Sequence, residues 1–266
     1  MSDTSRMWEI VSPYLSYMED NYLDLDSIRT LTSVIRDPAL VIGGGQGLLV
    51  EELRKQGLKV DGVDAEPKMI EYAAQRRGID LVLAQGNKMP FDDNSYATSI
   101  IATGVIDFLD DEEQIRSILA EATRVTDDDG QILVAFYRWH PKGEELGRYI
   151  GIITPQDRWR FRRSYEVFRL KPLAFIRSVA RDNNVGLLGA FYTLISIQIS
   201  LPKKVKRGTK RFAAMWKEVE NPNELIEHVP ESVPYWSEAS IKTLFGNLDI
   251  NIREILTLDS CYVVKL

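Results

Sequence analysis

The chain has 266 residues, of which 44% are hydrophobic and 27% are charged, which suits one large α/β domain with an insertion or a small cap. Its single cysteine, Cys261, excludes an internal disulfide, and with only two histidines the composition disfavours a structural zinc site, so we expect no metal. No apolar run reaches the roughly 20 residues of a membrane-spanning helix, and the N-terminus lacks a signal-peptide pattern, which together indicate a cytoplasmic protein.

The net charge of −6 hides a strong division of charge along the chain. Residues 138–217 contain 18 Lys/Arg against five Asp/Glu, so this segment carries +13 and the remainder carries −19. Such a division indicates that the basic segment has a partner or a substrate task of its own.

The first 37 residues are predicted to form an N-terminal helical cap. Apolar residues from Trp8 to Met18 recur at helical spacing with Pro13 as an interruption, and a second helix is predicted over residues 25–35. One interpretation is a cap over a sheet edge. The other is a lid in which a tyrosine touches a ligand, the candidates being Tyr14, Tyr17 and Tyr22.

From residue 38 to residue 137, strand patterns and helix patterns alternate. The acidic stretch Asp127–Gly130 predicts a turn before the last strand of this series. The strands are predicted over residues 39–42, 58–63, 80–84, 97–103 and 131–137, and the helices over 48–56, 67–77 and 112–125. The alternation predicts an α/β fold with a doubly wound, Rossmann-like parallel sheet, in which ligands bind at the carboxyl ends of the strands.

The alternation stops after residue 137 and resumes at Trp236. Residues 138–235 are predicted to be a basic helical insertion that acts as a substrate lid, and residues 38–137 with 236–266 form the core. In the last segment a helix with Ser237 as its N-cap is predicted to end at Gly246. A strand pair over residues 249–256 and 261–265 then completes a seven-stranded, mostly parallel sheet with an antiparallel last strand.

A glycine turn follows the first predicted strand, in A-L-V-I-G-G-G-Q-G over residues 39–47. The spacing of Gly43, Gly45 and Gly47 is G-x-G-x-G, whereas a dinucleotide-binding turn has G-x-G-x-x-G. The turn therefore argues against NAD and for a different nucleoside. Backbone N–H groups and a helix N-terminus at this place suit a ligand with an anionic end.

Polar residues follow the next two strands. Asp64 closes the second strand, where its carboxylate can accept hydrogen bonds from ribose hydroxyls; it can also be the N-cap of the helix that starts at Pro67. Gln85 and Asn87 follow the third strand and can bond the edge of an adenine.

Together these motifs resemble class I S-adenosylmethionine-dependent methyltransferases, especially the small-molecule branch that contains the ubiquinone and menaquinone biosynthesis enzymes. The family's first motif matches V-I-G-G-G-Q-G, its G-D-A-x-x-L-P-F stretch aligns with A-Q-G-N-K-M-P-F, and E-A-T-R-V-T-D-D-D-G-Q-I-L-V-A is similar to its helix, turn and fifth strand. The resemblance covers residues 39–137 and 236–266. It implies S-adenosyl-L-methionine as cofactor and S-adenosyl-L-homocysteine as product. The implied binding residues are Gly43, Gly44, Gly45, Gly47, Asp64, Ala65, Met69, Gln85, Gly86, Asn87, Thr103 and Gly104.

Three positions depart from the family pattern. Val41 replaces the acidic residue of the first motif, Gln85 replaces the usual aspartate at the adenine, and Ala97 replaces a common aspartate at the start of the fourth strand. The first two departures keep open a non-catalytic binding protein on the same fold.

The implied reaction is in-line transfer of a methyl group from a sulfonium to a nucleophile, for which alignment and exclusion of water matter most. A base is needed only where the nucleophile carries a proton. The candidate catalytic residues lie near the ends of the fourth and fifth strands and are Asp107, Tyr137 and His140. The alternative for His140 is a surface or packing role.

The insertion combines basic, aromatic and apolar stretches. Residues 158–163 alternate cations and aromatic rings, and the uncharged run Val185–Leu201 precedes six Lys/Arg between Lys203 and Arg211. The run can be an ordinary cap or a homodimer contact. It can also cover an apolar substrate, with residues 185–211 making peripheral contact with an anionic membrane. RNA modification is a further alternative, although the overall acidity disfavours nucleic acid. We expect a methyltransferase that acts on a small or lipid-like acceptor.

Overall fold

The computed structural model describes residues 4–17, 25–106, 109, 111–138, 172–182, 184–200, 203–228, 236–258 and 261–266. The chain divides into two compact units. The core unit comprises Tyr22–Arg138 and Trp236–Leu266, and the insertion unit comprises Met1–Asn21 and Trp139–Tyr235. The predicted N-terminal cap is thus shared between the units, since its second helix groups with the core.

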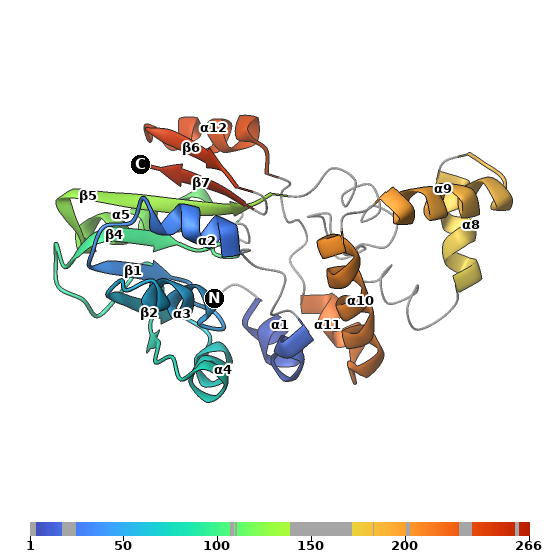
Figure 1. The fold of residues 1–266 in the computed structure, drawn as a ribbon, viewed down its shortest axis with the longest axis horizontal. Helices are drawn as coiled ribbons and strands as arrows, with labels where there is room; N and C mark the ends of the chain where they lie inside the picture. Colours follow the sequence, from blue (N-terminus) through green and yellow to red (C-terminus); the bar gives the residue numbers. More distant parts are fainter. Residues whose placement is uncertain are drawn as a thin grey trace. The chain divides into compact units, whose positions relative to one another are not determined.

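The core unit is built on one seven-stranded sheet with the order β3-β2-β1-β4-β5-β7-β6 (Figure 1). The five strands from β3 to β5 pair in parallel, and β7 pairs antiparallel with both β5 and β6. The strands are β1 (Ala39–Ile42), β2 (Val60–Asp64), β3 (Val82–Leu83), β4 (Tyr96–Ile101), β5 (Thr126–Tyr137), β6 (Glu254–Thr257) and β7 (Cys261–Lys265). The predicted doubly wound sheet with an antiparallel last strand is confirmed.

Helices cover both faces of this sheet. The side chains of β1 point alternately into two apolar layers, one on each face, that the sheet forms with these helices. Val41 packs in a layer with residues of α2, α3 and α4, whereas Leu40 and Ile42 pack in a layer with α5 and α12. All four residues of β1 are buried, so the strand forms the centre of the unit. The helices are α2 (Leu25–Thr32), α3 (Leu48–Lys55), α4 (Pro67–Arg77), α5 (Glu112–Val125) and α12 (Glu238–Asn247).

The predicted turn at Asp127–Gly130 is wrong, since these residues belong to β5. Tyr96 pairs with Thr126 and Thr98 pairs with Gln131, so a two-residue step on β4 faces a five-residue step on β5. The extra residues form an irregular bulge within the strand. Residue types that favour turns also favour such a bulge. A Cβ at Gly130 would lie 2.6 Å from the carbonyl oxygen of Asp127, which explains the glycine at this position.

The predicted last helix is confirmed as α12 with a small extension. Ser237 is its N-cap and shares a reciprocal capping box with Ser240. The helix continues through Gly246 and ends at Asn247, one residue beyond the predicted stop.

The insertion unit is helical in its described parts. Its elements are α1 (Thr4–Val11), the 3-10 helix η1 (Ser12–Tyr17), α8 (Pro172–Asp182), α9 (Leu187–Ser200), α10 (Lys203–Glu218) and α11 (Pro222–His228). Arg6 of α1 forms an ion pair with Glu224 of α11. The hydroxyl of Tyr14 donates to the Glu218 carbonyl oxygen at 2.9 Å, and that of Tyr17 donates to the Glu218 carboxylate at 2.6 Å. Both tyrosines therefore bond inside this unit, and Tyr22 lies outside the described residues.

Candidate functional site

The glycine turn lies at the carboxyl end of the central strand β1 and is held by the end of β2. The N–H groups of Gly43 and Gly44 both donate to the carbonyl oxygen of Val63, at 3.0 and 2.8 Å. Gly43 has φ of 79°, and a Cβ there would lie 2.1 Å from Cγ2 of Val105. Because both the backbone conformation and the close approach exclude a side chain, glycine is required at this position.

The middle of the turn faces open space. Gly45 has φ of 52°, and no atom lies within 4 Å of the position that its Cβ would occupy. Gly47, with φ of 76°, is the N-cap of α3, so the first helical N–H groups follow directly. The turn thus leaves an unobstructed strip of backbone beside a helix N-terminus, which suits close approach of a polar ligand.

Asp64 joins β2 to this turn. Its Oδ2 accepts the Gly45 N–H at 2.7 Å and its Oδ1 accepts the Glu66 N–H at 2.9 Å. A carboxylate has about four lone-pair sites, so beside these backbone bonds the group can still accept a hydrogen bond from a neighbouring hydroxyl. Burial raises the pKa of Asp64, and the nearby Glu66 carboxylate raises it further, while the backbone N–H groups oppose this rise. A ligand that donates to the carboxylate would favour its ionised form.

The alternative role of Asp64 as a helix cap is not what the structure shows. Glu66 is the N-cap of α4, and its side chain accepts the N–H of Lys68 at 3.3 Å. Asp64 instead holds the backbone of the glycine turn and of Glu66. Its carboxylate thus stabilises the glycine turn and does not cap the helix.

The other predicted binding residues lie at the same edge of the sheet, because β1 to β5 are parallel and their carboxyl ends coincide. After β3, Gln85 and Asn87 are exposed, and a Cβ at Gly86 would meet Ile42 at 3.2 Å, which puts this stretch against the end of β1. After β4, Thr103 and Gly104 are half-buried. On the loop and helix after β2, Ala65 is exposed whereas Met69 is 5% exposed.

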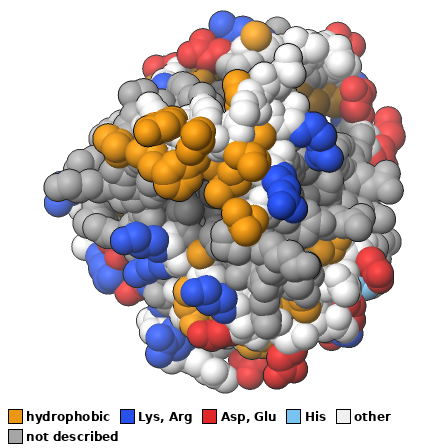
Figure 2. Space-filling view, turned by 90° about the vertical axis from the view of Figure 1, so that its right-hand side faces the viewer, with side chains coloured by type: hydrophobic (Ala, Val, Ile, Leu, Met, Phe, Trp, Pro, Cys, Tyr) orange, Lys and Arg blue, Asp and Glu red, His pale blue; other side chains and the backbone are white. Residues whose placement is uncertain are grey.

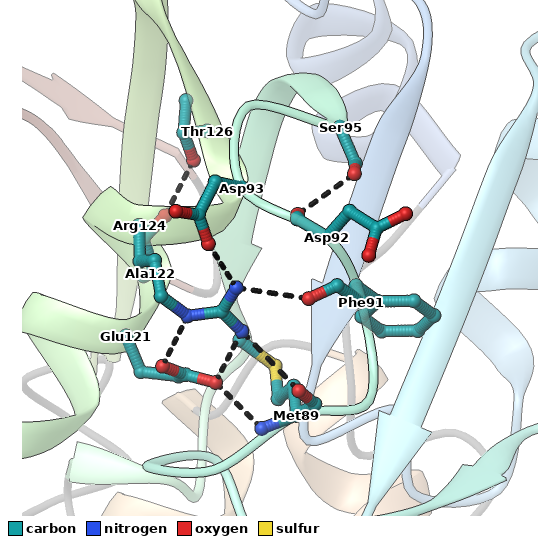
Figure 3. Close-up of polar contacts among 9 residues, drawn as sticks. All are labelled: Met89, Phe91, Asp92, Asp93, Ser95, Glu121, Ala122, Arg124 and Thr126. Carbon is teal, nitrogen blue, oxygen red and sulfur yellow. Dashed lines mark hydrogen bonds and ion pairs between the residues drawn. The ribbon is translucent and has the colours of Figure 1, made fainter.

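An arginine on α5 fixes the loop that follows the Gln85–Asn87 stretch (Figure 3). Arg124 donates to the carbonyl oxygens of Met89 and Phe91, at 3.2 and 2.9 Å, and to the Asp93 carboxylate at 2.6 Å. Two further bonds of 2.8 Å join it to Glu121, which itself accepts the Met89 N–H at 2.6 Å. These bonds lower the pKa of Glu121 and raise that of Arg124.

The network around Arg124 was not predicted from the sequence. Glu121 and Arg124 stand in the quoted stretch E-A-T-R, where their i, i+3 spacing indicates an ion pair on the helix. Their loop partners lie 31 to 35 residues away, so the spacing alone does not reveal them. The network fixes the position of the loop relative to α5.

Val41, where the family motif has an acidic residue, is fully buried in the apolar layer with α2 and α3. A carboxylate at this position would be flanked by apolar side chains. The neutral residue is thus consistent with its packing, and the site lacks one negative charge that the family motif supplies.

Of the predicted catalytic residues, the structure describes one. Tyr137 is half-buried at the carboxyl end of β5, where it pairs with Cys261 of β7. Asp107 and His140 lie outside the described residues, as does the basic and aromatic stretch of residues 158–163.

Comparisons with known proteins agree with this geometry. Residues 40–134 match the family model described as a methyltransferase domain. The demethylmenaquinone methyltransferase of Corynebacterium urealyticum is 27% identical over 128 residues, which are 48% of this chain and 54% of that protein. That of Tropheryma whipplei is 25% identical over 132 residues, 48% of this chain and 53% of that protein. The chain therefore spans about half the length of the curated relatives it matches.

Among solved structures, a protein of Pyrococcus horikoshii superposes with a TM-score of 0.51 at 15% identity, and the match covers 97% of each chain. At this identity the likeness concerns the fold. The match to the family model confirms, over residues 40–134, the resemblance to methyltransferases that the motifs predict.

Proposed function

We propose that this chain, whose residues 40–134 match a methyltransferase domain, transfers a methyl group from S-adenosylmethionine to a small or lipid-like acceptor. The observation that carries the proposal is the clamp of Asp64 on Gly45, with a spare carboxylate lone pair beside an open glycine turn. A carboxylate at the end of β2 next to such a turn suits a ribose with two free hydroxyls.

In this proposal the residues at different strand ends bind different parts of the cofactor. Asp64 accepts a hydrogen bond from a ribose hydroxyl, and the open backbone at Gly45 accommodates the methionine part. The exposed amides of Gln85 and Asn87 bond the adenine edge. Thr103 and Gly104 at the end of β4 border the ligand from the opposite side of β1.

The cofactor supplies an electrophilic methyl group, so the protein has to align the acceptor with it and exclude water. We infer that Tyr137, at the end of β5, orients an acceptor by its hydroxyl. Asp107 and His140 are candidates for accepting a proton from a hydroxyl or amine acceptor. In-line displacement requires the acceptor atom on the opposite side of the methyl carbon from the sulfur.

The lipid-like acceptor is supported by the two similar proteins, both of which are demethylmenaquinone methyltransferases. An acceptor of that class is a naphthoquinol with an apolar tail.

Calorimetry with S-adenosylmethionine tests the cofactor part of the proposal. Asp64→Ala removes the acceptor for a ribose hydroxyl, so we expect at least a tenfold loss of affinity, since a hydrogen bond to a charged group is worth about 1.5–3 kcal/mol. The matched control is Asp80→Ala, which removes an exposed aspartate just before β3, at the amino edge of the sheet. Equal affinities of the two variants would contradict the assignment of Asp64.

Transfer of labelled methyl from S-adenosylmethionine to prenylated naphthoquinols lacking the ring methyl tests the acceptor class. We expect label in the organic-soluble product and stoichiometric S-adenosylhomocysteine. Cofactor binding without transfer to any quinol, phenol or amine in a panel would instead favour a non-catalytic binding protein.

A further inference from the structure

One helix of the insertion unit presents large apolar side chains to solvent. Figure 2 shows hydrophobic side chains gathered in one exposed patch on the side that carries α8 and α9. On α9, Leu188 is 75% exposed, Ile199 is 72% exposed and Tyr192 is 69% exposed. We call the following six residues the α9 apolar face: Leu187, Leu188, Phe191, Tyr192, Ile195 and Ile199.

The residues of the α9 apolar face lie on one side of the helix and are not scattered around it. At about 100° of rotation per residue, the six positions lie within an arc of roughly 140°. The packed side of the helix lies outside this arc. Ala190 is fully buried there, and Leu194 packs in a small cluster with Val179 and Ala180 of α8. The helix thus has apolar side chains both where it meets α8 and where it meets solvent.

An uncharged helix with a broad apolar face is normally covered by protein or lipid. The sequence of α9, L-L-G-A-F-Y-T-L-I-S-I-Q-I-S, contains no charged residue. Its 14 residues correspond to a length of about 21 Å, less than the hydrocarbon thickness of roughly 30 Å. Accordingly, no helix in the described parts of the chain has the length and apolarity to cross a membrane. An apolar helix of this kind can instead lie in the plane of a bilayer surface.

Basic residues flank this helix on both sides in the chain. On α8, the exposed Leu173, Arg177 and Arg181 follow one another at i, i+4 spacing, so the two guanidinium groups share a helix face with an apolar residue. After α9, only Leu201 and Pro202 separate it from α10, which opens with K-K-V-K-R-G-T-K-R. Residues 172–217 contain nine Lys/Arg and one acidic residue, Asp182.

We propose that the α8–α9 hairpin docks on an anionic lipid bilayer, with the α9 apolar face inserted at the level of the headgroups and the flanking Lys/Arg bound to lipid phosphates. The apolar stripe accounts for insertion, and the positive charge accounts for the choice of an anionic surface. A second copy of this chain would bring the same positive charge against itself, so charge complementarity favours lipid. The docking is independent of methyl transfer, although it would bring the protein to a membrane-dissolved acceptor.

Vesicle co-sedimentation with the full chain tests this docking. We expect binding to vesicles of phosphatidylcholine with 30% phosphatidylglycerol, little binding to pure phosphatidylcholine, and a steep loss of binding as salt rises. The double variant Leu188→Asp/Ile199→Asp should lower the partition coefficient at least tenfold, because both side chains are exposed and charge is excluded from the lipid interior. Replacing the six Lys/Arg of residues 203–211 by Gln should remove the preference for anionic vesicles.

The matched control is Ala74→Asp/Ala239→Asp, which adds the same charge at two exposed helix positions of the core unit. It should bind vesicles almost as well as the unmodified chain. Circular dichroism and calorimetry with S-adenosylmethionine check that each variant is folded, so a failed methyl-transfer assay cannot be mistaken for failed docking.

Three results would overturn the proposal. The first is absence of binding to anionic vesicles at low salt. The second is a dimer that Leu188→Asp/Ile199→Asp converts to a monomer, which would assign the α9 apolar face to a second copy of the chain. The third is tighter binding to single-stranded RNA than to vesicles, with no effect of the same double variant.

Discussion

At the scale of single residues, the glycines of the turn have two different roles. Some positions cannot hold any side chain, whereas others leave room beside the backbone for a ligand. Gly43 is required by its backbone conformation and by the 2.1 Å approach of Val105 to a Cβ there. Gly45 has a positive φ but open surroundings, so only a ligand would compete with a side chain at this point. The two glycines should therefore respond differently to the same substitution.

We predict that Gly45→Ala folds but binds S-adenosylmethionine at least tenfold more weakly. The strain of a left-handed alanine costs about 1–2 kcal/mol of stability, and the new methyl group occupies the open strip of the turn. The control is Gly57→Ala, since Gly57 also has positive φ, 89°, and no atom within 4 Å of its Cβ position, but lies between the end of α3 and the amino end of β2. Thermal unfolding and calorimetry should show similar destabilisation and different affinities. Unchanged affinity of Gly45→Ala would place the cofactor elsewhere.

At the scale of elements, the core unit depends on contacts that join a helix to a distant loop. The carboxyl end of α5 holds residues 89–95 through Arg124 and through the N–H groups of Asn94 and Ser95, which donate to backbone carbonyl oxygens of Arg124 and Val125 at 2.9 Å. This loop follows directly on Gln85–Asn87. The position of the proposed adenine contacts is thus determined partly by a helix on the sheet face.

We predict that Arg124→Ala lowers the free energy of unfolding by about 1–2 kcal/mol at neutral pH. Five hydrogen bonds are lost, but a third of the side chain is exposed, so solvent reduces their value. Arg124 lowers the pKa of Glu121, so this contribution is present above the pKa of an ordinary glutamate and is lost as the pH falls through the lowered value. The difference between the two proteins in urea unfolding should therefore shrink below about pH 4.

The control for this prediction is Gln114→Ala, which shortens an exposed side chain on the same helix and should change stability by less than about 0.5 kcal/mol. A constant gap between Arg124→Ala and the unmodified chain from pH 7 to pH 3 would show that the ion pair with Glu121 contributes nothing.

At the scale of the whole molecule, the chain crosses between its two units more than once. The first helices belong with the insertion, as the hydrogen bonds of Tyr14 and Tyr17 to Glu218 show. Leu15 of η1 is fully buried, and η1 packs on α10. The N-terminal segment is therefore part of the hydrophobic core of the insertion unit.

We predict that Leu15→Ala destabilises the insertion unit by about 2–4 kcal/mol, because it leaves a cavity where α10 meets η1. Hydrogen exchange should quicken at backbone amides of α10 and α11 and stay unchanged in β1, β2 and β4. The exposed neighbour, Ser16→Ala, should leave all of these rates as they are. Faster exchange in the strands as well would show that the two units unfold together.

The regular part of the core was predictable because its signals are local. The alternation of apolar strands with amphipathic helices places β1, α4 and α5 within a residue of their observed ends. Two details were predicted wrongly, because residue types that favour turns also occur in bulges and several polar residues near a helix start can act as its N-cap. The acidic stretch at Asp127–Gly130 bulges within β5, and Glu66 rather than Asp64 caps α4.

The amino-acid order is therefore sufficient to specify a parallel sheet, the glycine turn and an acidic residue at the end of β2, since hydrophobic period and glycine spacing act over a few residues. Folding decides which groups meet. Gly45 and Asp64 are 19 residues apart, and Arg6 and Glu224 are 218 apart, yet each pair is joined by a hydrogen bond. It also decides that one side of α9 packs on α8 while the other stays exposed, because burial depends on the surrounding chain and not on the apolar character of the helix alone.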